Sequence, residues 1–420
     1  MTYFRLYIDP GTGSMLFAIL IGLLGVARFA FKGLWVKIRF LFSGGKAKDN
    51  SDQSIPLAVF SDDKRYWSVF EPILKELNKR GVDCVYMTAS EDDPGLKTEM
   101  EHVKAECIGP GNKAFAKLNF LKANMLLSTT PGVDVYQWKR SKDVDWYVHL
   151  THMIGGGFDY RMFGVQFFDA LLYSSDAFTP AHRELEQKRG SAPKDIVAVG
   201  CTYLDRILER FHAENELPQH EKIRVLVAPS WGPNSLFNQF GDRILKQLIS
   251  SDFDITVRPH PQSYLVEQEL LQSLQASFPE SDRLHWNRDP DNFDVLSHSD
   301  VMISDFSGVI FDFSFVFERP VIYPHIEFDM GMNDQVWIKE PFWCEEALPL
   351  IGSELRMDEL DRLNALIETL VQQSGNREKL RQARERYWQN RGRAAEAVVD
   401  YLVSKCEALK QADASGRERA

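Results

Sequence analysis

Short apolar runs alternate with amphipathic stretches over most of the chain, beginning near Ile55. An apolar run of four to eight residues bounded by turn residues is typical of a buried strand, whereas apolar residues three and four apart indicate a helix. Strands that alternate with helices favour parallel sheets. We expect strands at residues 56–60, 82–88, 125–128, 146–150, 170–175, 196–200, 222–229, 253–258, 301–304 and 321–323, and helices at 66–79, 113–121, 201–211, 240–250, 265–276, 293–298 and 309–317.

These elements divide into two sets, and each set can form a doubly wound parallel sheet with its own core. We expect two α/β domains, at 55–215 and 216–385, that face each other across a cleft. Residues 386–420 are expected to form a C-terminal helix that crosses back over both domains, with a short tail. Ligands of open α/β sheets bind beyond the carboxyl ends of the strands, so the functional residues should directly follow strands.

The first 42 residues have a different character. Residues 11–27 carry no charged side chain, and Arg28 and Lys32 follow within a stretch rich in aromatic and basic residues. Seventeen residues are at the short limit for a spanning helix, so spanning and re-entrant insertion both stay open. No basic region precedes the apolar run, which argues against a cleaved signal peptide. We expect a membrane anchor with a basic amphipathic segment at 1–42, and a polar linker at 43–54.

Charge is distributed unevenly along the chain. The first 48 residues hold seven Lys or Arg and one Asp, whereas the rest holds 42 basic and 59 acidic residues, a net charge of −17. The acidic body disfavours nucleic-acid binding. The basic residues after the apolar run place the body at the cytoplasmic face of a membrane, against an anionic surface. The five cysteines are scattered without a CxxC pair, so neither a zinc site nor a disulfide framework is indicated.

An arginine and a histidine lie at the end of the strand expected at 253–258. Arg258 and His260 alternate with Pro259 and Pro261, which restrict the backbone around both. A guanidinium binds phosphate through two hydrogen bonds, and an imidazole donates to a phosphoryl oxygen or exchanges a proton near neutral pH. The structural alternative pairs the arginine with a local carboxylate and the histidine with a loop carbonyl. We interpret the pair as part of a phosphate site.

A second histidine precedes three glycines in the first domain. His149 lies within the strand expected at 146–150 and should face one side of the sheet, whereas His152 falls beyond its end, where the cleft is expected. His152 is therefore the candidate catalytic residue of this domain. Gly155, Gly156 and Gly157 allow a ligand to approach the backbone closely, or form only a flexible turn.

Small hydroxylated residues join the strand expected at 301–304 to the helix expected at 309–317. Ser304, Asp305, Ser307 and Gly308 can offer hydroxyl and backbone N–H groups at the positive end of the helix dipole, which favours an anion such as phosphate. Capping of the helix is the simpler interpretation of the same residues.

Other features narrow the chemistry. Ser230 and Trp231 follow the first strand of the second domain, where they either contact a base or ribose or belong to a plain loop. The chain has no HExxH, GxSxG or P-loop motif, which disfavours metalloprotease, serine-hydrolase and P-loop chemistry. No metal-binding motif is evident and no cofactor is expected, although a Mg²⁺ ion that accompanies a donor diphosphate stays open.

Six segments in a fixed order carry a resemblance to a known family. Together they resemble the CDP-glycerol glycerophosphotransferase family, the teichoic acid primases and polymerases with the two-domain GT-B fold, and the likeness covers most of the body. The family's histidine motif usually has Trp before the histidine, where this chain has Thr151, and this departure concerns acceptor specificity. The segments are HLTHMIGGGFDYRMFG, FDALLYSSDAF, VAVGCTYLDRI, VLVAPSW, VRPHP and SDFSGVIFDFSFVFERPVIYP.

The resemblance implies a membrane-anchored transferase of cell-surface polymer synthesis. It implies that a polyol phosphate moves from a CDP-polyol donor to a hydroxyl of a lipid-linked saccharide or polymer, with release of CMP. His152 would be the general base on the acceptor hydroxyl, and His260 with Arg258 would hold the donor diphosphate. The remaining residues divide into donor-binding Ser230, Trp231, Ser304, Asp305, Ser307 and Gly308, and acceptor-side Gly155, Gly156 and Gly157.

Two other functions stay compatible with the sequence. GT-B glycosyltransferases and epimerase-like enzymes that use a UDP-sugar share paired doubly wound domains and phosphate loops at strand ends. A non-catalytic membrane module that binds a nucleotide or a polymer fits if Thr151 marks a lost acceptor site. The sequence also leaves open whether the polyol is glycerol or ribitol and whether one unit or many are added.

Overall fold

The computed structural model describes residues 54–214, 221–305, 307–325, 331–373 and 375–417. The expected membrane anchor, nearly all of the expected linker and the expected domain boundary at 215–216 lie outside these residues. Within the described part, no helix combines the length and the apolarity needed to cross a bilayer.

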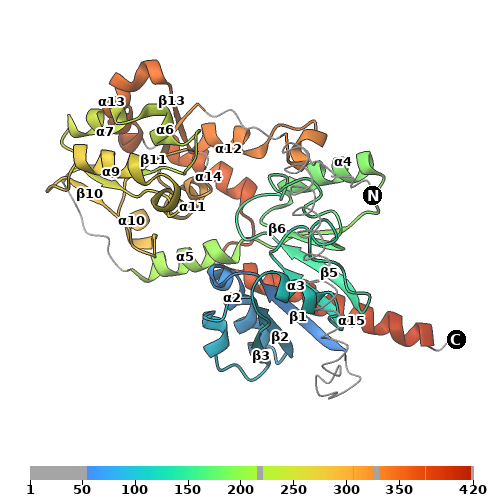
Figure 1. Ribbon diagram of the computed structural model, residues 1–420. Coiled ribbons are helices and arrows are strands. Elements are labelled where there is room, and N and C mark those ends of the chain that lie inside the picture. Colours follow the sequence, from blue (N-terminus) through green and yellow to red (C-terminus); the bar gives the residue numbers. More distant parts are fainter. Residues whose placement is uncertain (1–53, 215–220, 306, 326–330, 374, 418–420) are drawn as a thin grey trace, which may run out of the picture. The chain divides into compact units, whose positions relative to one another are not determined.

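The first half of the body is a parallel sheet of seven strands in the order β3-β2-β1-β4-β5-β6-β7 (Figure 1). In its register, Phe60 pairs with Ser128, and Ser128 pairs with His149, so the strands that carry the candidate chemistry end side by side. The strands are β1 (Ile55–Ser61), β2 (Cys84–Thr88), β3 (Val103–Cys107), β4 (Ala123–Ser128), β5 (Val144–Leu150), β6 (Ala170–Tyr173) and β7 (Asp195–Ala198), and the helices are α2 (Trp67–Lys79), α3 (Asn112–Leu118), α4 (Thr179–Arg189) and α5 (Thr202–Ala213).

The second half is a parallel sheet of six strands in the order β10-β9-β8-β11-β12-β13. Its strands are β8 (Arg224–Ala228), β9 (Asp254–Val257), β10 (Leu284–Trp286), β11 (Val301–Ser304), β12 (Val321–Pro324) and β13 (Gly352–Leu355). Its helices are α6 (Leu236–Phe240), α7 (Arg243–Ile249), α8 (Ser263–Val266), α9 (Gln268–Ser277), α10 (Phe293–Ser297), α11 (Val309–Phe317), α12 (Trp343–Ile351) and α13 (Leu363–Gln372). The expectation of an α/β fold with two parallel sheets is confirmed.

The strands that the sequence pattern missed have a common cause. Strands β3, β10 and β13 lie at sheet edges, where only part of each strand is buried and no continuous apolar run is required. The helix expected at 240–250 begins only at Arg243, as α7. Gly241 has a φ of 61°, a left-handed conformation that ends the preceding helix α6, which we did not expect.

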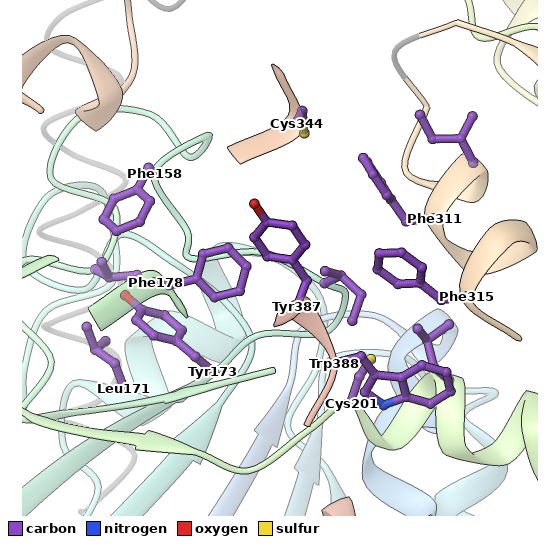
Figure 2. Packing of buried hydrophobic residues seen from close by; sticks show 14 of the residues in the cluster. Phe158, Leu171, Tyr173, Phe178, Cys201, Phe311, Phe315, Cys344, Tyr387 and Trp388 are labelled. Atoms are coloured by element: carbon purple, nitrogen blue, oxygen red, sulfur yellow. The ribbon is translucent and has the colours of Figure 1, made fainter. Parts of the chain in front are cut away.

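Both sheets are buried on both faces, as parallel sheets require. Adjacent residues of β8 show this, because Leu226 and Val227 belong to different apolar clusters. One cluster continues from the first sheet to the second, and aromatic residues dominate its middle (Figure 2). There Tyr387 packs at ring-centroid distances of 5.8 Å from Phe178 and 5.2 Å from Trp343.

The C-terminal part of the chain returns from the second sheet to the first through two helices, and the second of them lies within 386–420, where we expected a helix. Helix α14 (Gly375–Tyr387) packs against α11 and α12, and α15 (Ala394–Arg417) packs against α2 of the first half (Figure 1). Asn390 and Gly392 lie between them with φ angles of 51° and 73°, which break the helix. The Asn390 amide donates to the Ala198 carbonyl at 2.8 Å and so fixes this break to the end of β7.

Candidate functional site

Arg258 directly follows β9 at the carboxyl end of the second sheet. Its guanidinium donates to the amide oxygen of Asn287 and, at 2.8 Å, to the main-chain oxygen of Asp289. Both partners are uncharged, and no carboxylate of the described residues forms an ion pair with this arginine. The side chain is therefore oriented by neighbours that leave its positive charge available to an anion.

His260 is exposed, and the direction of one hydrogen bond fixes its tautomer. The backbone N–H of Gln262 donates to His260 Nδ1 at 3.1 Å, so in the neutral ring the proton lies on Nε2. Partial burial lowers the pKa of His260, although the negative charges of Asp305 and Glu267 oppose this effect. Near neutral pH the side chain is thus a neutral donor that presents Nε2–H to a ligand oxygen.

The segment from Ser304 to Gly308 divides into an inward and an outward part. Ser304 is fully buried, and its hydroxyl donates to the Ala228 carbonyl of the neighbouring strand at 2.6 Å. Asp305 is also fully buried and accepts hydrogen bonds from the backbone N–H groups of Ser230 and Leu236. Ser304 therefore holds the neighbouring strand end, and Asp305 holds the loop after β8 and the start of α6. The donor-binding role that we assigned to both stays a prediction.

Ser307 and Gly308 form the outward part of the segment. Ser307 is half-buried and Gly308 is exposed at the N-terminus of α11, the positive end of that helix dipole. Their placement agrees with the phosphate-binding role expected for them, which stays a prediction.

Ser230 and Trp231 lie on the loop after β8. The backbone N–H of Ser230 is used by Asp305 at 3.0 Å, and the residue is only 6% exposed. Trp231 is 46% exposed. Ser230 is therefore buried and Trp231 is exposed, although the sequence assigned both to donor binding. That role stays a prediction for both residues.

A cavity of about 570 Å³ lies at this end of the second sheet. Arg258, His260 and Ser307 all line it, as expected from the sequence. Helix α5 contributes further lining residues that we did not predict, and the loop after β10 contributes others. These additional residues are Tyr203, Arg206, Ile207, Arg210, Asp291 and Asn292.

The sequence contains a pattern from which the part of α5 in lining the cavity could have been predicted. Tyr203, Arg206 and Arg210 are three and four residues apart, so they lie on one face of the helix. Arg210 forms ion pairs with Asp291 and Asp294, and its guanidinium lies 3.9 Å from the centre of the Phe293 ring. The cavity therefore combines several basic groups with aromatic and carboxylate neighbours, a composition suited to a nucleoside diphosphate.

His152 lies just beyond the end of β5, and His149 lies within the strand, as their spacing predicts. The ring of His152 is edge-on to Tyr66 at a centroid distance of 4.9 Å, and its Nδ1 is buried without a hydrogen-bond partner among the described residues. Burial, together with the positive charge of Arg65, lowers the pKa of His152 to about 4. The imidazole is therefore neutral near pH 7 and can accept a proton.

The glycines after His152 are buried and do not border the cavity. A Cβ atom on Gly156 would lie 2.4 Å from the Phe158 ring, so this position excludes any side chain. Met153, the residue after His152, lies close to the second half of the body. A Cβ atom on Gly308 would lie 3.7 Å from the terminal carbon of Met153. The turn that carries His152 thus reaches the N-terminus of α11, although His152 itself does not line the cavity.

Comparison with known proteins explains this arrangement. Residues 202–404 match the family model described as CDP-glycerol:poly(glycerophosphate) glycerophosphotransferase. The chain carries a glycerophosphotransferase-family domain. This glycerophosphotransferase domain extends from α5 to α15, and it includes every lining residue of the cavity except Ser68. The family resemblance seen in the sequence is thereby confirmed.

One curated relative is the teichoic acid glycerol-phosphate primase of Bacillus spizizenii, which is 22% identical over 253 residues. That match covers 57% of this chain and 59% of the primase, so the chain matches little more than half of its relative's length.

Solved structures extend the likeness to most of the chain at the level of the fold. A structure of the wall teichoic acid polymerase TagF, soaked with CDPG, is similar with a TM-score of 0.54 and 16% identity, over 91% of this chain and 98% of that chain. The UDP-GlcNAc 2-epimerase of Methanocaldococcus jannaschii also has a TM-score of 0.54, at 13% identity, over 83% of this chain and 99% of that chain. The chain as a whole thus has a two-sheet fold similar to those of TagF and of this epimerase.

Proposed function

We propose that this protein transfers a polyol phosphate, with glycerol phosphate as the first candidate, from a CDP-activated donor to a hydroxyl of a lipid-linked saccharide or polymer. The observation that carries the proposal is the convergence of Arg258, His260 and Ser307 on one cavity within a glycerophosphotransferase-family domain. The names of the primase and of the polymerase TagF support teichoic acid synthesis as the process.

In the proposed reaction, the acceptor oxygen attacks the phosphorus that bears the polyol. The bond from this phosphorus to the bridging oxygen breaks, CMP leaves, and the proton of the acceptor hydroxyl passes to His152. Arg258 and the Nε2–H group of His260 balance the charge that develops on the CMP phosphate. Phosphoryl transfer depends mainly on positioning and charge stabilisation, which these groups supply.

The surroundings of His152 support its role as the base. Its ring is neutral near pH 7, and the adjacent Met153 lies beside Gly308 at the N-terminus of α11. An acceptor held in the first half would therefore be close to a donor phosphate held by the second half. The helix N-terminus at Gly308 favours the anionic donor at this point.

Replacement of either histidine tests the mechanism. We expect His152→Ala and His260→Ala to lower the rate of CMP release from CDP-glycerol or CDP-ribitol, with a lipid-linked saccharide as acceptor, by about 100-fold or more. The melting temperature should change little, because His260 is exposed and the buried Nδ1 of His152 has no hydrogen bond to lose. The same assay with EDTA tests whether a Mg²⁺ ion accompanies the donor, which the sequence leaves open.

His285→Ala is the matched control, because His285 lies on the edge strand β10 with half of its side chain exposed and away from the lining residues. It should leave transfer unchanged. Full activity of either cavity variant removes that histidine from the mechanism. Release of UDP from a UDP-sugar, without CMP release from either CDP-polyol, would instead favour the glycosyltransferase or epimerase-like alternative.

A further inference from the structure

The strand order of the first sheet has a topological switch point between β1 and β4. Chain connections from these neighbouring strands run in opposite directions along the sheet, and ligands of doubly wound sheets bind at such a switch point. Asp62 follows β1 and Thr130 lies two residues beyond β4, while His152 lies two residues beyond the adjacent β5. The switch point therefore brings together polar side chains from three loops.

These side chains share an unusual property. Asp62 Oδ1, Thr130 Oγ1 and His152 Nδ1 are all buried, and none has a hydrogen-bond partner of good geometry among the described residues. Burial raises the pKa of Asp62, and Thr130 lies close enough to its carboxyl to act on it and oppose this rise. Thr130 is only 8% exposed. Buried polar atoms are almost always paired, so three unpaired atoms at one sheet edge indicate groups that are kept for a ligand.

Comparable hydroxyl groups at the same edge are used within the protein. Ser128 donates to the Phe60 carbonyl at 3.1 Å, and Thr151 donates to the Leu172 carbonyl at 3.3 Å. Thr88, which ends β2, donates to Asp93 Oδ2 at 2.6 Å. Among the hydroxyl groups at this sheet edge, those of Ser128, Thr151 and Thr88 are thus paired, and those of Thr129 and Thr130 beyond β4 are not. His149 within β5 also has unpaired ring nitrogens, but its ring is enclosed by Tyr160 and Phe168.

The chemistry of the unpaired atoms selects the ligand. A carboxylate oxygen only accepts hydrogen bonds, whereas a threonine hydroxyl and a neutral imidazole can each donate or accept. A ligand hydroxyl satisfies both requirements, but a fully ionised phosphate has no proton to offer Asp62. The Tyr66 ring, edge-on to His152, provides an apolar surface for the C–H groups of a polyol or sugar.

We propose that Asp62 and Thr130 bind the hydroxyl-bearing end of the acceptor and position its attacking oxygen at His152. This inference rests on the proposed function, because it assigns the acceptor subsite of the same reaction. Two acceptor ends share the required chemistry, namely the glycerol terminus of a growing polymer and a saccharide. Asp62 and Thr130 act as positioning residues, and the proton is still taken by His152.

Steady-state kinetics of Asp62→Asn and Thr130→Val test the subsite. We expect the acceptor KM to rise about tenfold or more for Asp62→Asn and about three- to tenfold for Thr130→Val, since a hydrogen bond to a charged group is the stronger. The KM for CDP-glycerol should stay unchanged. Thr130→Val should also keep or raise the melting temperature, because it removes a buried hydroxyl that has no partner in the folded protein.

Thr88→Val is the matched control, because it removes a threonine hydroxyl that is paired with Asp93 at the same sheet edge. It should lower the melting temperature and leave the acceptor KM unchanged. Two results together would refute the subsite. The first is that Thr130→Val lowers the melting temperature as much as Thr88→Val does. The second is that the acceptor KM of both Thr130→Val and Asp62→Asn stays at the wild-type value.

Calorimetric titration without turnover separates this inference from the proposed function. Glycerol 3-phosphate represents the polymer end and methyl β-N-acetylglucosaminide represents a saccharide. The subsite is supported if the wild type binds one of the probes and Asp62→Asn binds it about tenfold or more weakly. The probe that binds identifies the acceptor class, even if CDP-glycerol is not turned over. If the wild type transfers the polyol phosphate and both variants keep its acceptor kinetics, the subsite is refuted and the proposed function is not. If the wild type binds neither probe and the acceptor kinetics of the variants are unaltered, the subsite is also contradicted.

Discussion

His149 and His152 are three residues apart, yet the fold gives their rings different surroundings. His149 is fully buried between Tyr160 and Phe168, at centroid distances of 5.5 and 5.0 Å, and neither ring nitrogen has a partner in the described part of the chain. Burial lowers the pKa of His149 to about 3. Strand alternation predicted only that His149 faces one side of the sheet, and the packing of Tyr160 and Phe168 against its ring explains why the ring stays neutral.

This histidine makes stability depend on pH. The unfolded chain takes up a proton on the imidazole below about pH 6.5, whereas the folded protein does so only near pH 3, so stability falls as the pH drops below 6.5. We expect His149→Phe to be more stable than the wild type at pH 5.5 and to lose about 1.4 kcal/mol less between pH 7.5 and 5.5. Urea unfolding at both pH values measures this, and an unchanged pH dependence would show that His149 does not remain neutral when folded.

At the scale of elements, the connection between β11 and α11 performs two tasks. Its first two residues, Ser304 and Asp305, hold the neighbouring strand end and the loop after β8, whereas Ser307 lines the cavity. The sequence predicted a strand, a short connection and a helix at these positions, and the helix bounds agree with α11. It did not distinguish the two tasks, because serine and aspartate suit both internal hydrogen bonds and phosphate binding.

The two parts should respond differently to substitution. We expect Asp305→Ala to lower the free energy of unfolding by about 1–3 kcal/mol, because the buried N–H groups of Ser230 and Leu236 lose their acceptor. Ser307→Ala should leave stability nearly unchanged and raise the KM for the CDP-polyol. Chemical denaturation and donor kinetics of both variants provide the measurements; equal stability of the two variants would contradict this division of tasks.

At the scale of the whole molecule, residues 54–420 form a compact unit of their own. All of the buried apolar residues assigned to the core lie between Leu57 and Leu402, and one cluster includes residues of both sheets together with Tyr387 of α14. We therefore expect a variant that lacks residues 1–42 to fold. It should move from the membrane to the soluble fraction, because the apolar run at 11–27 and the basic residues after it are removed.

Fractionation of cells and the melting temperature of the purified variant test this expectation. A full-length variant with Leu20→Lys and Leu23→Lys is the control, since it keeps the length and removes only the apolar character of the run. Membrane association that persists in both variants would refute a single N-terminal anchor and would place an additional membrane contact in the body.

The sequence by itself determined the alternation of strands and helices, the two parallel sheets, the family resemblance and the positions of Arg258, His260, Ser307 and His152 beyond strand ends. These features follow from periodicity and local motifs, which are read along the chain. Only the tertiary structure decided that Ser304 and Asp305 are used internally, that α5 lines the cavity, and that Asp62 and Thr130 meet near His152. The partner of a polar atom depends on strand order and on packing between distant segments, and neither is contained in a local pattern.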